Sequence, residues 1–111
     1  MTTIRDYHAH VYFAQESIER ATALCEQVRD ECGVKMGRVH SKPVGPHPVW
    51  SCQLLIPTSA IGDTLGWLAL NRNGLTIFVH PNTGHALADH TQHAIWLGQI
   101  LPLNICIFKR D

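Results

Sequence analysis

The chain has 111 residues, of which 45% are hydrophobic and 16% are charged, and its formal net charge at pH 7 is zero. This is the composition of an ordinary globular protein, and the length favours one domain covering residues 1–111. No run of Lys and Arg indicates a nucleic-acid surface and no apolar stretch is long enough to span a membrane, so we expect neither partner. A near-neutral surface favours self-association, and we expect a homodimer.

Four cysteines are present, and none forms a C-x-x-C pair: Cys25, Cys32, Cys52 and Cys106. We expect no secretory signal before them. We therefore expect a cytoplasmic protein whose reduced thiols pack as small apolar groups.

Hydrophobic periodicity predicts two strand–helix–strand units in succession. The first has a strand over Asp6–Phe13, a helix over Glu16–Cys32 ended by Gly33, and a strand over Val34–His40. The second has a strand over Val49–Ile56, a helix over Ala60–Asn71 and a strand over Leu75–His80. We expect a third helix over Leu87–Leu97 and a fifth strand in the segment NICIFK near the end.

Two such units in a small domain predict an α+β, ferredoxin-like βαββαβ sandwich, with an extra C-terminal helix and strand. Its antiparallel sheet would have the order 4-1-3-2, with both helices on one face. The other face then requires a cover, which a partner, an added element or a ligand site could supply.

Strand side chains alternate between two faces, which divides the first strand into two sets. Ala9, Val11 and Phe13 suit the core beneath the helices, and the other set is His8, His10 and Tyr12. The same alternation assigns these residues to the helix-free face: Arg38, His40, Ser51, Gln53, Thr76, Phe78 and His80. Because strands one and four should be neighbours, we expect His80 beside His8 or His10. Imidazoles, a phenol and amides indicate a pocket here rather than a solvated surface.

Eight of the 111 residues are histidine, more than chance would supply. Converging imidazoles are typical of iron, zinc, copper or nickel sites, and they also serve as acids and bases near neutral pH. Loop histidines add to the set: His47 between two prolines, and His85, His90 and His93 after the fourth strand. The spacing alone fixes no metal and does not separate a metal site from a polar sheet face.

Four segments together resemble the DOPA 4,5-dioxygenase family: YHAHVYF, GPHPVWSCQLLIP, WLALNRNGLTIFVHPNTGHALADH and AIWLG. The resemblance runs from about Asp6 to Ile107. It implies a ferredoxin-like fold, non-haem Fe(II), and extradiol cleavage by O₂ of a catechol such as DOPA. The matched positions are His8, His10, His47, Trp50, Asn71, Arg72, His80, Thr83, Gly84, His85, Asp89 and His90.

On this basis we expect three metal ligands, His10, His47 and His80, with zinc able to replace Fe(II). We expect His8 and His85 to act as acid and base. The expected substrate contacts are Tyr12, Arg38, Trp50, Arg72 and His90. The two arginines could pair with the carboxylate of an amino-acid-like substrate, because a guanidinium binds a carboxylate with two hydrogen bonds.

Structural interpretations stay open for several of these residues. Asp89 could complete a two-histidine, one-carboxylate iron site, or it could cap the third helix. Arg72 could complement the dipole at the end of the second helix, and Tyr12 and Trp50 could be packing residues. For the whole protein two alternatives remain: a non-catalytic ferredoxin-like dimer with adventitious metal, and a zinc-dependent hydrolase.

Overall fold

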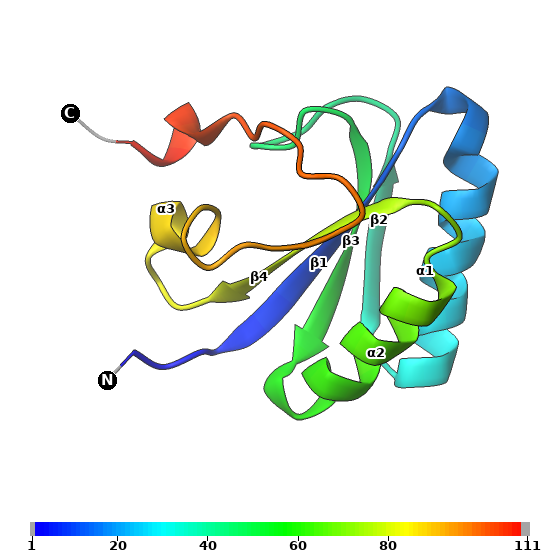
Figure 1. The fold of residues 1–111 in the computed structure, drawn as a ribbon, viewed down its shortest axis with the longest axis horizontal. Coiled ribbons are helices and arrows are strands. Elements are labelled where there is room, and N and C mark those ends of the chain that lie inside the picture. Colours follow the sequence, from blue (N-terminus) through cyan, green and yellow to red (C-terminus); the bar gives the residue numbers. More distant parts are fainter. Residues whose placement is uncertain (1, 110–111) are drawn as a thin grey trace.

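The computed structural model describes residues 2–109 and shows one antiparallel sheet with two long helices on one of its faces (Figure 1). The strands are β1 (Asp6–Phe13), β2 (Lys35–His40), β3 (Trp50–Pro57), β4 (Thr76–Asn82) and β5 (Ile95–Leu97). The helices are α1 (Ile18–Cys32), α2 (Ile61–Asn71) and α3 (Ala86–Asp89), with 3-10 turns at Gln15–Ser17, Thr58–Ala60 and Ile105–Phe108. The sheet order is β2-β3-β1-β4-β5, which confirms the ferredoxin-like order and adds β5 outside β4.

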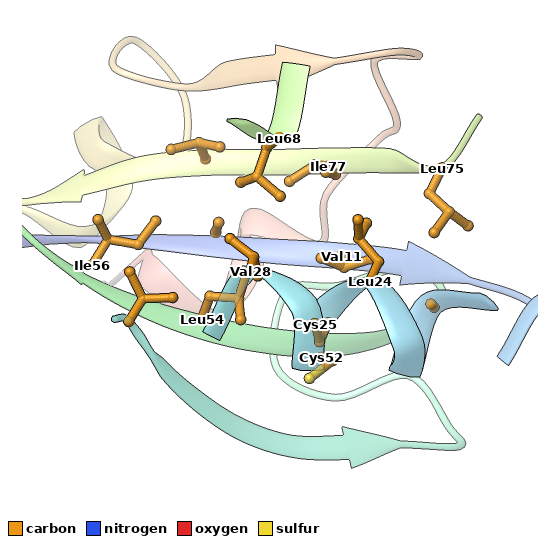
Figure 2. Packing of buried hydrophobic residues seen from close by; sticks show 14 of the residues in the cluster. Val11, Leu24, Cys25, Val28, Cys52, Leu54, Ile56, Leu68, Leu75 and Ile77 are labelled. Atoms are coloured by element: carbon orange, nitrogen blue, oxygen red, sulfur yellow. The ribbon is translucent and has the colours of Figure 1, made fainter. Parts of the chain in front are cut away.

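The core lies between the sheet and the pair α1 and α2. On α1, Ala21, Leu24, Cys25 and Val28 are buried, a spacing that brings all four to one side of a helix. Gly33 ends α1 in a left-handed conformation with φ of 67°, and its N–H donates to the carbonyl of Arg29. Figure 2 shows three of these helix residues, Leu24, Cys25 and Val28, in one cluster with strand residues that include Val11, Leu54, Ile56 and Ile77.

The C-terminal third of the chain differs from the prediction in two ways. The helix expected over Leu87–Leu97 is wrong, because α3 ends at Asp89 and Ile95–Leu97 forms β5 instead. Strand β5 pairs with the free edge of β4, where backbone groups would otherwise lack partners. The strand expected in NICIFK is also wrong. That edge of β4 is already taken, and Ile105–Phe108 forms a short 3-10 helix.

Strand β2 departs from simple alternation. A bulge between Met36 and Val39 lets both side chains pack against the core, although the prediction placed them on opposite faces. Beyond the bulge, His40 pairs with Ser51. The expected position of His40 on the helix-free face is therefore retained.

The chain itself covers much of the helix-free face. In Figure 1, α3 and the C-terminal segment lie on the side of the sheet away from α1 and α2. The β2–β3 loop joins them, because the N–H of Asn104 donates to the carbonyl of Pro46 at 2.8 Å. Within the described residues, no helix is both long enough and apolar enough to cross a bilayer.

Candidate metal centre

Three histidines meet on the helix-free face of the sheet. His8 and His10 belong to β1, and His80 lies directly across from His8 on β4. One ring nitrogen from each lies within 4.8 Å of the other two. His10 and His80 are buried, whereas His8 is only half-buried, so the group opens to solvent on the side of His8.

The ring of His80 is fixed in the orientation that a metal ligand needs. Its Nδ1–H donates to the carbonyl of Pro81 at 3.0 Å, which leaves Nε2 as the nitrogen with a free lone pair. That Nε2 lies 3.1 Å from Nε2 of His10. Two nitrogens bonded to one ion at about 2.0–2.1 Å are roughly 3 Å apart. The pair therefore has the separation of two ligands of a single ion.

Burial keeps these imidazoles neutral at pH 7. It lowers the pKa of His10 well below the usual value, and the neighbouring histidines lower it further. It lowers the pKa of His80 to about 4, although the bond to Pro81 opposes the shift. The pKa of His8 is also lowered, again mainly by burial. Neutral imidazole is the form that binds iron, zinc, copper and nickel, so the donor set fits a divalent ion of this group.

His47 and Tyr12 form a second layer beside the three nitrogens. The ring centre of His47 is 4.1 Å from that of His10, and Nδ1 of His47 lies 2.6 Å from the hydroxyl of Tyr12. Burial raises the pKa of Tyr12, so the phenol keeps its proton. Depending on which partner donates, Nε2 of His47 carries either a proton or a free lone pair. An imidazole in this setting can accept or donate a proton. His47 is not one of the three histidines whose nitrogens meet, although we expected it to be a metal ligand.

An aromatic wall closes the β4 side of the site. The ring centre of His90 lies 4.0 Å from that of His80 and 4.3 Å from that of Phe108, with the rings tilted, and Nδ1–H of His90 donates to the carbonyl of Ala86. Behind it, Phe78 stacks on Trp96 at 4.6 Å. His90 is among the expected substrate contacts, whereas Trp96 is not, because the predicted helix over Leu87–Leu97 includes it and the structure places it on β5. The sequence signal for this strand is the apolar run Ile95–Leu97, which also fits the two-residue period of a β-strand.

Other predicted site residues lie elsewhere. His85 is exposed at the start of α3 and takes part in none of the ring contacts above. Trp50 packs against Phe13 with the core on the helix side of the sheet. Arg72 ends α2 and donates to the carbonyl of Leu75 at 2.9 Å, and Arg38 is exposed on the edge strand β2. The structure does not bring His85, Trp50 or Arg72 to the three histidines.

The carboxylate of Asp89 is engaged away from the three nitrogens. One oxygen accepts from the backbone N–H of Thr83 at 2.8 Å, and the other accepts from the Thr83 hydroxyl at 2.7 Å and from His93 at 3.1 Å. Burial opposes its ionisation, but these bonds outweigh burial and lower the pKa of Asp89. Asp89 is the last residue of α3, so it does not cap a following helix. It holds together the turn between β4 and α3.

The fold and this site define a class: an α+β domain with a ferredoxin-like sheet that can hold a metal ion between neighbouring strands. Residues 7–107 match the model of the Dopa 4,5-dioxygenase family, and the chain belongs to this family. This confirms the resemblance on which the site predictions were based.

Individual relatives agree with the family. The chain is 34% identical to the DOPA 4,5-dioxygenase of Amanita muscaria over 92% of its own length, and 37% identical to an uncharacterized 21.2 kDa protein of Botryotinia fuckeliana over 94%. It spans 49% and 63% of these two relatives. A crystal structure from Nostoc punctiforme, described provisionally as a dioxygenase, is 42% identical with a TM-score of 0.80. The match covers 92% of this chain and 89% of that one.

Proposed function

We propose that this chain is a non-haem iron dioxygenase that opens a catechol ring beside its two hydroxyls. One O₂ is consumed for each ring opened, one carbon–carbon bond is broken, and both oxygen atoms enter the product. The observation that carries the proposal is the meeting of three neutral imidazole nitrogens within 4.8 Å, in a chain of the Dopa 4,5-dioxygenase family.

In this proposal His8, His10 and His80 hold Fe(II). Bound Fe(II) would supply the redox chemistry toward O₂ and would acidify the catechol hydroxyls. The three ligands are neutral, and no carboxylate joins them among residues 2–109, so an anionic catechol would balance the two charges of a bound ion. Pro81 keeps Nε2 of His80 free of a proton, and His90 and Phe108 exclude water from that side.

We assign proton transfer to His47 rather than to His8 and His85. When Nδ1–H of His47 donates to Tyr12, its Nε2 can accept a proton from a catechol hydroxyl and later return it to the product. Tyr12 acts as a positioning residue, because its hydroxyl orients the imidazole. Pro46 and Pro48 restrict the loop that carries His47, and the bond from Asn104 ties this loop to the C-terminal segment.

The two other functions have less support. A non-catalytic dimer would need its histidine face sealed by a second chain, whereas the β2–β3 loop and the C-terminal segment cover part of that face. A zinc hydrolase would use the same donors, but zinc has no redox chemistry with O₂. The family favours the oxygenase. A homodimer and a cytoplasmic location remain predictions.

The test is anaerobic reconstitution of untagged protein with Fe(II), followed by addition of DOPA or 4-methylcatechol and then O₂. We expect one iron per chain and a yellow ring-opened product that forms only when iron, catechol and O₂ are all present. His93→Gln is the matched control, because His93 is exposed and its bond to Asp89 lies outside the site. Stoichiometric iron with no product from any catechol would contradict the proposal.

A further inference from the structure

The C-terminal segment, residues 99–109, is fastened to the loop that carries His47. Figure 1 shows the segment in orange and red beside the β2–β3 loop. The N–H of Asn104 donates to the carbonyl of Pro46 at 2.8 Å, and among residues 2–109 this is the one backbone-to-backbone bond that joins the segment to the rest of the chain. Because Pro46 directly precedes His47, the bond holds the backbone next to the proposed acid–base group.

The backbone at Asn104 is shaped for this contact. Its φ of −82° and ψ of 85°, together with a bond of 3.1 Å from the N–H of Ile105 to the carbonyl of Leu103, form an inverse γ-turn. The donor in this turn is the main-chain N–H of Asn104, and the residue is exposed. The contact to Pro46 therefore depends on the backbone and not on the asparagine side chain.

Apolar side chains hold the same segment against the protein. Leu101, Leu103 and Ile105 are half-buried, whereas Pro102 and Asn104 between them are exposed. This alternation gives an extended segment one side that faces the protein and one that faces solvent. A segment held mainly by partly covered apolar groups opens more readily than a strand inside a sheet.

The segment also reaches the surroundings of the metal site at two other places. Leu101 lines an open pocket of about 230 Å³ that is also lined by Tyr12, the hydrogen-bond partner of His47. Further along, the ring centre of Phe108 lies 4.3 Å from that of His90. The segment thus extends from the acid–base side of the site to its aromatic wall.

We propose that residues 99–109 are a strap that positions His47 beside the metal site, and that the N–H of Asn104 is the group through which the strap acts. This inference rests on the proposed function and deepens it by separating metal binding from proton transfer. The three ligand histidines lie on β1 and β4, so iron binding does not require the strap. Proton transfer by His47 does require it. The two prolines that flank His47 stiffen the loop, but they have no N–H with which to tie its backbone down.

The test removes the donor and uses loss of the side chain alone as the control. Asn104→Pro deletes the N–H, and proline tolerates a φ close to −82°, as in an inverse γ-turn. Asn104→Ala removes the same side chain but keeps the N–H. Both variants are made in the full chain, alone and combined with His47→Gln, and circular dichroism checks their folding.

Three quantities are measured. Iron content and kcat with DOPA are measured on iron-loaded protein. Amide hydrogen exchange is measured on metal-free protein at Asn104 and at His47, whose N–H donates to the carbonyl of Val44 at 3.0 Å.

We expect Asn104→Pro to bind one iron per chain and to lose about 10- to 100-fold in kcat, because a small displacement of a catalytic group is costly. Exchange of the His47 amide should become about five- to tenfold faster. Asn104→Ala should stay within about twofold of the wild type in each measurement. With His47→Gln, Asn104→Pro should cost no more than about a further twofold in kcat, because the group through which it acts is gone.

Four results would overturn the inference in folded variants: equal losses in Asn104→Pro and Asn104→Ala, an unchanged kcat in Asn104→Pro, loss of its iron, or an undiminished loss of kcat when His47→Gln is also present. The wild type supplies a measurement that does not depend on the folding of any variant. Its Asn104 amide should exchange at least about tenfold more slowly than in an unstructured peptide, and an unprotected amide would also overturn the inference.

The same measurements distinguish this inference from the proposed function. If catechols are opened and Asn104→Pro keeps the wild-type kcat, the function stands and the inference fails. If the wild type opens no catechol, the function fails. Faster exchange of the His47 amide in Asn104→Pro, but not in Asn104→Ala, would then still support the strap.

Discussion

Nε2 of His80 lies 3.1 Å from Nε2 of His10, and the other nitrogen of His80 donates to the carbonyl of Pro81. Two buried imidazoles with lowered pKa values gain little by facing one another unless they share a proton or a metal ion. In the proposed iron site the two imidazoles share a metal ion. This predicts which substitutions remove the metal.

Replacing His10 or His80 with alanine should lower the affinity for Fe(II) at least about 100-fold, because each removal leaves two of three protein ligands. The measurement is iron stoichiometry after anaerobic dialysis, with circular dichroism to confirm folding and His93→Gln as control. Full occupancy in both folded variants would contradict the ligand assignment.

His8 and His47 should have different roles. His8→Gln should lose iron, whereas His47→Gln should keep it and lose about 10²–10⁴-fold in kcat, the range for loss of an acid–base group. Tyr12→Phe should keep iron and lose less activity than His47→Gln, because it removes only the 2.6 Å bond that orients His47.

Iron content and kcat measured on the same preparations decide between these roles. If His47→Gln loses the metal while His8→Gln retains it, the expectation drawn from the sequence, with His47 as ligand and His8 as base, is the correct one.

Asp89 should stabilise the fold without binding the metal. Asp89→Ala leaves the backbone N–H and the hydroxyl of Thr83 without their acceptor, which should lower the free energy of unfolding by about 1–3 kcal/mol. Urea titration measures this loss, and the iron content of the folded variant should equal that of the wild type. A folded Asp89→Ala protein without iron would show that the carboxylate reaches the metal.

The metal-free protein should become less stable in mild acid. Burial lowers the pKa of His47 and of His80 to about 4, whereas each titrates near 6.5 in the unfolded chain. Between these values the unfolded state binds more protons, so stability falls as the pH drops from about 6.5 to 4 and levels off beyond each end. The expected loss is on the order of a few kcal/mol.

Urea unfolding in the presence of a chelator at pH 7, 5.5 and 4.5 measures this slope. His47→Gln should reduce the loss of stability between pH 7 and 4.5, because glutamine does not titrate and only the contribution of His47 is removed. A stability that is constant or that rises toward pH 4.5 would show that these histidines are hydrated and charged in the folded protein.

The part of the site that lies on β1 and β4 could be predicted because strand geometry is simple. Period-two alternation puts His8 and His10 on one face, and the ferredoxin-like order puts His80 beside them. The same rule failed on β2, where a bulge inserts one residue between Met36 and Val39. A bulge depends on pairing with β3 and leaves little signal in six residues of sequence.

Strand alternation does not predict the contacts that the loops make. The hydrogen bond between Tyr12 and His47 joins residues 35 positions apart, and nothing local to either residue encodes it. Sequence periodicity does not decide the structure around Trp96, because a short apolar run fits both a helix and a strand, and pairing with the open edge of β4 selects the strand.

The most direct test of the proposed ring opening is the ratio of O₂ consumed to DOPA opened when iron-loaded protein is mixed with DOPA and O₂. The proposed function predicts one O₂ per product and loss of product in His80→Ala. The product mass should equal that of DOPA plus one O₂, less one water once the amine condenses with the new aldehyde. DOPA recovered unchanged from fully iron-loaded protein, or oxidised to a quinone with its ring intact, would contradict it.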